Sequence, residues 1–176
     1  MRQATKLLIT VISGFYLACL LVPGLEPYLY LNRYLVLDNG EYWRLLTVAL
    51  THGGLVHLFF NMYALLILGN TLEGAIGQNK FLAIFVISQF GASLASIFFG
   101  PSNIISVGAS GAIFGLFGAM IVISKRFGLE TKSTYVIVGI NFAIGFIFPG
   151  IDWRAHLGGF ITGLVVASVL LSPARS

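Results

Sequence analysis

Long apolar segments recur along the whole chain, and they restrict the fold more than any other feature. A helix needs about 20 mainly apolar residues, within a range of about 17 to 25, to cross the hydrocarbon core of a bilayer. Six stretches satisfy this requirement: residues 6–23, 55–73, 81–99, 108–124, 133–149 and 155–172. We therefore predict an all-α, polytopic membrane protein whose six transmembrane helices form one domain over residues 1–176.

The composition agrees with a membrane protein and excludes several other classes. Only 9% of the residues are charged, whereas soluble domains typically carry about 25%. The net charge of +4 is spread over short loops and forms no basic patch, so we predict no nucleic-acid partner. A single cysteine, Cys19, excludes an internal disulfide and a cysteine metal cluster. The first apolar run continues through Cys19 without a small-residue cleavage site, which predicts a retained helix and not a signal peptide.

The positions of the basic residues predict the orientation in the membrane. If the N-terminus is cytoplasmic, seven basic residues fall on the inner side and three on the outer side. The inner set is Arg2, Lys6, Lys80, Lys125, Arg126, Lys132 and Arg175, and the outer set is Arg33, Arg44 and Arg154. Because basic residues accumulate on the cytoplasmic side, we predict a multi-pass cell-membrane protein with both termini in the cytoplasm.

The longest connection, residues 24–54, then lies outside and is rich in Tyr and Trp. Amphipathic rings at this density are typical of a loop that lies in the membrane interface. An ordinary aromatic belt explains the composition equally well.

Unusual polar residues occur near the outer ends of the second, fourth and sixth predicted helices. His57 and Asn61 begin the second, Ser110 opens the fourth and His156 opens the sixth. These three helices run in the same direction, so the polar side chains share one depth. His57 and Asn61 are one helical turn apart and therefore face the same way.

Taken singly, these residues also have structural explanations. Ser110 can be a small packing residue, since the GxxxG spacings at 111–115 and 159–163 bring helix backbones together. Asn61 can form an interhelical hydrogen bond. A histidine within a membrane span is costly and is a functional hypothesis by default.

Metal binding by the three histidines, His52, His57 and His156, is a further alternative. No carboxylate ligand is close to them in the sequence, and the spacing of His52 and His57 differs from the i, i+4 spacing of helical zinc sites. We therefore predict no metal and no cofactor.

Considered together, the polar residues predict nucleophilic catalysis. A serine hydroxyl is a weak nucleophile until a base accepts its proton, and His156 on a neighbouring helix is such a base. Attack on an amide carbonyl produces an oxyanion, which needs fixed hydrogen-bond donors. His57, Asn61 and the free backbone N–H groups at the start of the fourth helix are suitable donors. The glycines allow Ser110 and His156 to meet.

Four motifs in this chain resemble those of rhomboid intramembrane serine proteases, in the same order and on the same helices. They are Gly108-Ala109-Ser110-Gly111 for GxSG, residues 155–163 with His156, Gly159 and Gly163 for AHxxGxxxG, His57 and Asn61 for HxxxN, and the Trp43-Arg44 pair of the first loop. The resemblance extends over essentially the full length of the chain.

The resemblance implies a six-transmembrane-helix rhomboid-like bundle with a water-filled cavity open to the outside. It implies a Ser110–His156 catalytic dyad, with an oxyanion hole formed by His57, Asn61 and the backbone N–H of Ser110. The implied partners are transmembrane protein substrates, cut in or near the outer part of the membrane, and the lipid bilayer. Some members have a tyrosine at the position of Phe114; here the ring can still stack on His156, without the hydroxyl.

The role of Asp152 is open between two alternatives. It can be a third catalytic residue that orients His156, or the N-cap of the last helix. Its position directly before that helix favours the cap.

Two other classes of protein remain as alternatives to a protease. One is a catalytically inactive rhomboid-like protein that binds membrane clients, although such relatives typically lack the serine or the histidine. The other is a channel for small polar solutes, which the apolar inner ends of the helices disfavour. The sequence specifies neither an oligomeric state nor a particular substrate.

Overall fold

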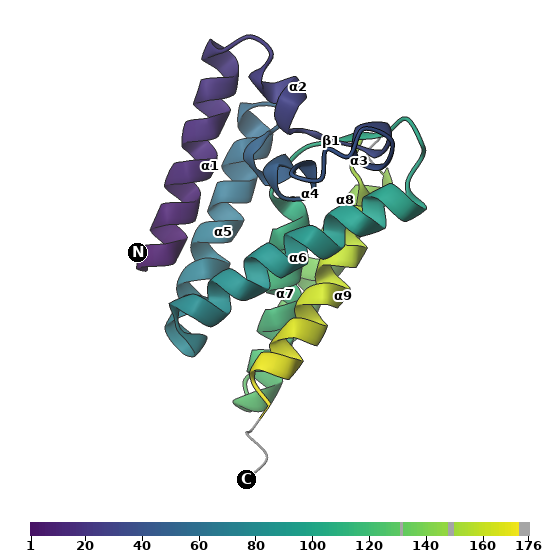
Figure 1. Ribbon diagram of the computed structural model, residues 1–176. Helices are drawn as coiled ribbons and strands as arrows, with labels where there is room; N and C mark the ends of the chain where they lie inside the picture. Colours follow the sequence, from purple (N-terminus) through teal and green to yellow (C-terminus); the bar gives the residue numbers. More distant parts are fainter. Residues whose placement is uncertain (131, 148–149, 173–176) are drawn as a thin grey trace.

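The computed structural model describes residues 1–130, 132–147 and 150–172, and long helices dominate it (Figure 1). The long helices are α1 (Gln3–Leu21), α5 (Leu55–Ile76), α6 (Gln78–Phe99), α7 (Ser110–Arg126), α8 (Lys132–Ile147) and α9 (Trp153–Leu170). Between α1 and α5 lie α2 (Leu25–Leu29), β1 (Leu31–Asn32), α3 (Arg33–Leu37), α4 (Arg44–Thr47) and the 3-10 turn η1 (Val48–Leu50). Strand β2 (Ile105–Ser106) pairs antiparallel with β1.

The six long helices overlie the six predicted segments, with differences at their ends. The second segment was expected to end at residue 73, but α5 continues to Ile76 and ends at Gly77, whose φ is +82°. The fourth was expected to begin at 108, but Gly108 has a φ of +116° and α7 begins at Ser110. The end of the fifth segment, residues 148–149, and Arg175 lie outside the described residues.

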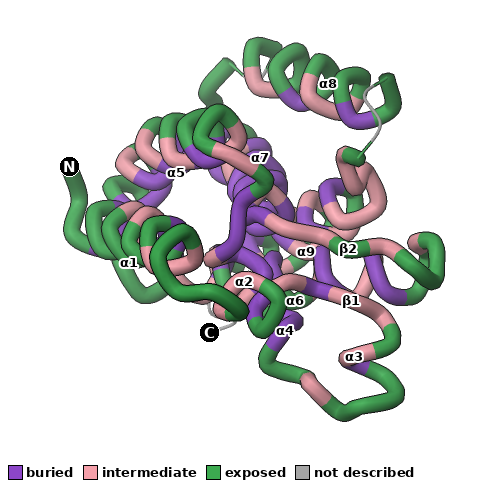
Figure 2. Tube along the Cα trace, turned by 90° about the horizontal axis from the view of Figure 1, so that it is seen from above, coloured by how far each residue is buried: buried purple, intermediate pink, exposed green. Residues whose placement is uncertain are grey.

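The long helices differ in how they could meet the bilayer. Helices α1, α5, α6 and α9 are long and apolar enough to cross a membrane, and α8 is a shorter apolar helix of 16 residues. Helix α7 has 17 residues, of which 12 are buried against other helices. It therefore lies mainly in protein, and Figure 2 shows it as a largely buried element inside the bundle. The chain is a polytopic helical membrane protein.

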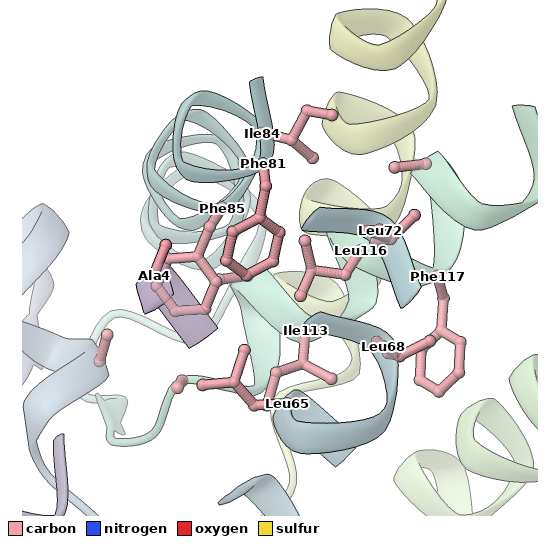
Figure 3. Packing of buried hydrophobic residues seen from close by; sticks show 14 of the residues in the cluster. Ala4, Leu65, Leu68, Leu72, Phe81, Ile84, Phe85, Ile113, Leu116 and Phe117 are labelled. Carbon is pink, nitrogen blue, oxygen red and sulfur yellow. The ribbon is translucent and has the colours of Figure 1, made fainter. Parts of the chain in front are cut away.

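The main core forms where α5, α6 and α7 meet near the start of α1 (Figure 3). Leu65, Phe81 and Leu116, one from each of the three helices, have no exposed surface. Burying such side chains contributes roughly 1.5–3 kcal/mol each in water, but lipid is itself apolar, so here close packing provides more of the stabilisation.

Small residues bring α7 and α9 into backbone contact. A Cβ atom at Gly159 would collide with the carbonyl oxygen of Gly111, and one at Gly163 would collide with the carbonyl oxygen of Gly115. Only glycine fits at these crossing points, so the two GxxxG sequences are matched to each other across the interface.

The connection between α1 and α5 is an ordered layer organised around Arg44. The Arg44 side chain is 3% exposed, donates hydrogen bonds of 2.8 Å to the carbonyl oxygens of Pro27 and Tyr30, and pairs with Glu41. The neighbouring Trp43 donates from Nε1 to the carbonyl oxygen of Tyr28 at 3.2 Å. The Trp43-Arg44 pair thus ties separate parts of this connection together.

Candidate active site

Ser110 is the first residue of α7, and the turn that precedes it is held in place by backbone contacts. The Gly108 N–H donates to the carbonyl oxygen of Val48 at 3.0 Å. The φ of +116° at Gly108 is readily accessible only to glycine, and it turns the chain into the helix. The Ser110 side chain is half-buried at the N-terminal end of α7, where backbone N–H groups are free of helical partners.

His156 lies in the first turn of α9 and is in hydrogen-bond contact with Ser110. The distance from His156 Nε2 to Ser110 Oγ is 2.9 Å, and His156 is 8% exposed. The Phe114 ring stacks on the imidazole, with centroids 4.1 Å apart and planes at 10°. The stack, together with the glycine crossing of α7 and α9, orients the imidazole toward the hydroxyl.

Asp152 forms hydrogen bonds to other groups than the imidazole. Its Oδ1 accepts from the Ala155 N–H at 3.2 Å, which makes it the N-cap of α9. Its Oδ2 accepts from the hydroxyl of Ser106 at 2.8 Å and from the hydroxyl of Ser96. Asp152 and His156 are joined through the backbone, where the His156 N–H donates to the Asp152 carbonyl oxygen at 3.2 Å. Within residues 1–130, 132–147 and 150–172, no hydrogen bond joins the Asp152 carboxylate to the His156 imidazole, and His156 Nδ1 has no protein partner.

His57 lies against the turn that carries Ser110. A Cβ atom at Gly108 would be only 2.9 Å from His57 Cε1, so the imidazole occupies the space that a side chain would need. His57 Nδ1 accepts a hydrogen bond of 3.3 Å from the Gly53 N–H. In a neutral imidazole the other nitrogen then carries the proton, so Nε2–H is available as a donor.

Asn61 lies one turn further along α5 and is 6% exposed. Its Nδ2 donates to the carbonyl oxygen of His57 at 2.9 Å. One amide hydrogen is therefore used within the helix, and the second is available to another acceptor.

Two further buried polar residues, Gln89 and His52, lie beside the site. Gln89 Oε1 accepts from the Ala112 N–H at 3.3 Å and so caps the first turn of α7. His52 packs edge-on against His57, with centroids 5.1 Å apart. Burial, and secondarily the neighbouring His57, lower the pKa of His52 to about 3, so this side chain is neutral at pH 7. Sequence spacing did not identify Ala112 as the hydrogen-bond partner of Gln89, because the two residues lie 23 positions apart and nothing in the segment around Gln89 marks it as a cap.

No group of three or more His, Cys, Asp or Glu side chains is arranged as a metal site in the part of the chain that the structure describes. The groups that meet at the start of α7 are a hydroxyl, an imidazole and several N–H donors.

Comparison with known proteins places this chain in a family. The Rhomboid domain family matches residues 39–173. RHOMBOID-like protein 4 of Arabidopsis thaliana is 41% identical over 143 residues, which cover 77% of this chain and 36% of that protein. Rhomboid protease GluP of Bacillus subtilis is 39% identical over 143 residues, covering 78% of this chain and 28% of that protein.

A third relative is closer in size. The putative rhomboid protease YdcA of Bacillus subtilis is 34% identical over 134 residues, covering 73% of this chain and 67% of that protein. The chain spans half or less of the length of the first relatives that it matches. This polytopic helical membrane protein belongs to the rhomboid family, as the motifs predicted.

Proposed function

We propose that this protein is an intramembrane serine endopeptidase that cleaves transmembrane segments in or near the outer part of the membrane. The observation that carries the proposal is the 2.9 Å contact between Ser110 Oγ and His156 Nε2. Membership of the rhomboid family supports it, as does the 39% identity to a relative named rhomboid protease GluP.

In the proposed reaction Ser110 is the nucleophile and His156 is the general base. Ser110 Oγ attacks the scissile carbonyl carbon while its proton passes to His156 Nε2. The imidazolium then gives that proton to the leaving amine, the C–N bond breaks and an ester to Ser110 remains. A water molecule, deprotonated by His156, hydrolyses the ester and restores the hydroxyl.

The negative charge that develops on the carbonyl oxygen needs donors that are already in place. We assign this role to His57 Nε2–H, the second amide hydrogen of Asn61 and the backbone N–H of Ser110. The contact of the His57 ring with Gly108 and the burial of Asn61 support the assignment. The role of Phe114 in this scheme is to hold the His156 ring by stacking.

A fluorophosphonate probe, which modifies activated serines, tests the proposal directly. We expect covalent labelling of the wild-type protein, and complete loss of labelling and of cleavage in Ser110→Ala and His156→Ala. Ser102→Ala, which changes an exposed loop serine, is the matched control and should label normally. A folded wild-type protein that binds transmembrane peptides but is never labelled would instead be an inactive client-binding member of the family.

The proposed oxyanion hole has its own test. We expect Asn61→Ala to lower kcat by up to the factor of about 10²–10³ that one lost donor costs in a soluble serine protease, with labelling by the probe retained at a slower rate. Full activity of the His57→Ala, Asn61→Ala double variant would remove both residues from the mechanism.

The cytoplasmic position of both termini, with the site open to the outside, is also a proposal and rests on the distribution of basic residues. In a Cys19→Ser background, we expect a membrane-impermeant thiol reagent added outside to label Asn103→Cys but not Asn79→Cys. Both positions are exposed, and they lie at opposite ends of α6. The reverse labelling pattern would place the site at the cytoplasmic face.

A further inference from the structure

A basic pocket lies at the end of the bundle opposite Ser110. Its cavity of about 240 Å³ is formed where α5, α7 and α9 end and α6 begins. Ser110 and Arg126 are the first and last residues of α7, so at 1.5 Å per residue the pocket is about 24 Å from the candidate active site along that helix. The lining includes two cations, Lys80 and Arg126, and an apolar wall formed by Ile76, Phe127, Leu170 and Leu171.

The two cations of this pocket have no anionic partner in the described ranges of the chain. Neither Lys80 nor Arg126 forms a salt bridge with a carboxylate there, whereas Arg44 is paired with Glu41. Lys80 and Arg126 are also both exposed, so their charges are free to attract an anion from outside the protein.

The start of α6 adds further donors at the same end. The first turn of α6 contains Lys80 and no acidic residue. The first hydrogen bond of the helix is donated by Phe81 to the carbonyl oxygen of Gly77, which leaves the N–H groups of residues 78–80 without helical acceptors. Free N–H groups and the positive end of the helix dipole both favour an anion.

We propose that this pocket binds the phosphate of an anionic phospholipid headgroup. Lys80 and Arg126 contact the phosphate, and the lipid's glycerol and upper acyl carbons lie along the wall formed by Ile76, Phe127 and the end of α9. The apolar wall favours a lipid over free phosphate, because inorganic phosphate would gain nothing from contact with leucine and phenylalanine. Basic pockets between transmembrane helices on the cytoplasmic side are typical sites for such headgroups.

Native mass spectrometry of the full chain tests the proposal without use of its catalytic activity. The Ser110→Ala protein is purified in detergent and titrated with phosphatidylglycerol or with phosphatidylcholine. We expect retention of one phosphatidylglycerol and no comparable retention of phosphatidylcholine. In the Lys80→Gln, Arg126→Gln double variant we expect phosphatidylglycerol affinity to fall about 30-fold, since each cation near an anionic lipid contributes about a fivefold factor.

The matched control is Lys6→Gln, Lys132→Gln, which removes two exposed positive charges that do not line the pocket. Its phosphatidylglycerol affinity should stay within about threefold of the parent, a limit set by screening of distant charges. Equal losses in both double variants would show general charge attraction and overturn the proposal, as would unchanged binding in Lys80→Gln, Arg126→Gln. Displacement of the lipid by millimolar inorganic phosphate would identify a free-anion site instead. Because labelling of Ser110 by fluorophosphonate is measured separately, failure of either proposal leaves the other intact.

Discussion

Helices α7 and α8 follow each other in the chain and have nearly the same length, yet they are buried very differently. Helix α7 buries 12 of its 17 residues, whereas the buried residues of α8 are Val138 and Gly145. Figure 2 shows α8 at the rim of the bundle with a largely exposed surface, beside the buried α7. Both helices are apolar, so hydropathy alone does not determine which one becomes the centre of the protein.

The difference originates in the size of the residues at the contacts. Helix α7 presents glycines that let α6 and α9 approach its backbone: a Cβ at Gly111 would collide with Ala92 and one at Gly115 with Ser88. In α8, by contrast, a Cβ at Gly139 would meet no atom within 4 Å. Close packing therefore makes α7 the fixed support of Ser110, while α8 rests against the bundle through fewer side chains, among them Phe142.

The sharpest test of this comparison replaces a glycine by leucine at the crossing of α9 with α7 and, separately, on α8. We expect Gly163→Leu to leave little or no folded protein, because the side chain would collide with the backbone of Gly115 and neither backbone can yield. The free energy of unfolding should fall by more than roughly 3 kcal/mol, the upper end of the range for ordinary overpacking. Gly139→Leu on α8 is the control and should change the free energy of unfolding by less than about 0.5 kcal/mol. Denaturation in mixed micelles measures the free energy of unfolding of both variants. Equal losses would contradict the difference in packing between α7 and α8.

A smaller effect is expected from aromatic residues that contact each other across the two helices. Phe114 on α7 is 4% exposed and packs against both His156 and Phe142, with centroids 4.1 Å and 4.8 Å away. Phe114→Ala should lower the free energy of unfolding by about 3 kcal/mol and should also slow cleavage, because His156 loses its stacking partner. Phe142 is only partly buried and pairs edge-on with Phe114 and Phe160. Phe142→Ala should cost about 1–3 kcal/mol, from about 0.5–1.5 kcal/mol for each aromatic pair. A larger loss for Phe142→Ala than for Phe114→Ala, measured by thermal unfolding, would mean that α8 is the better anchored helix.

The smallest effect concerns Asp152, which lies between α8 and α9. Its side chain accepts hydrogen bonds from Ala155, Ser106 and Ser96, and so links the start of α9 to β2 and α6. We expect Asp152→Ala to cost about 0.5–2 kcal/mol of stability as a lost cap, and Asp152→Asn to keep activity within about tenfold of wild type. Loss of a catalytic acid costs about 10⁴ in kcat in the soluble prototype. A loss of that size in a folded Asp152→Asn protein would make the site a Ser-His-Asp triad.

Hydropathy was sufficient to predict the long helices, because a bilayer demands long uninterrupted apolar segments. The meeting of Ser110 and His156 was also predictable, since both residues stand at the outer ends of helices that carry GxxxG sequences. The ordered layer at residues 24–54 was not predictable in detail: its helices have only four or five residues each and show no useful periodicity. The partners of Asp152 were equally hidden, because Ser106 and Ser96 lie 46 and 56 residues away in sequence and are ordinary small polar residues.

The separation of Ser110 and His156 along the chain also has a consequence for the time at which the site forms. The two residues are 46 positions apart, and α9 is the last long helix of the described chain. At a synthesis rate of about 5–20 residues per second, roughly 2–9 seconds pass between the addition of Ser110 and that of His156. Throughout that interval the nascent protein carries Ser110 without His156, the residue proposed as its base. If the proposed mechanism holds, the growing chain should therefore not react with a fluorophosphonate probe until α9 has been made.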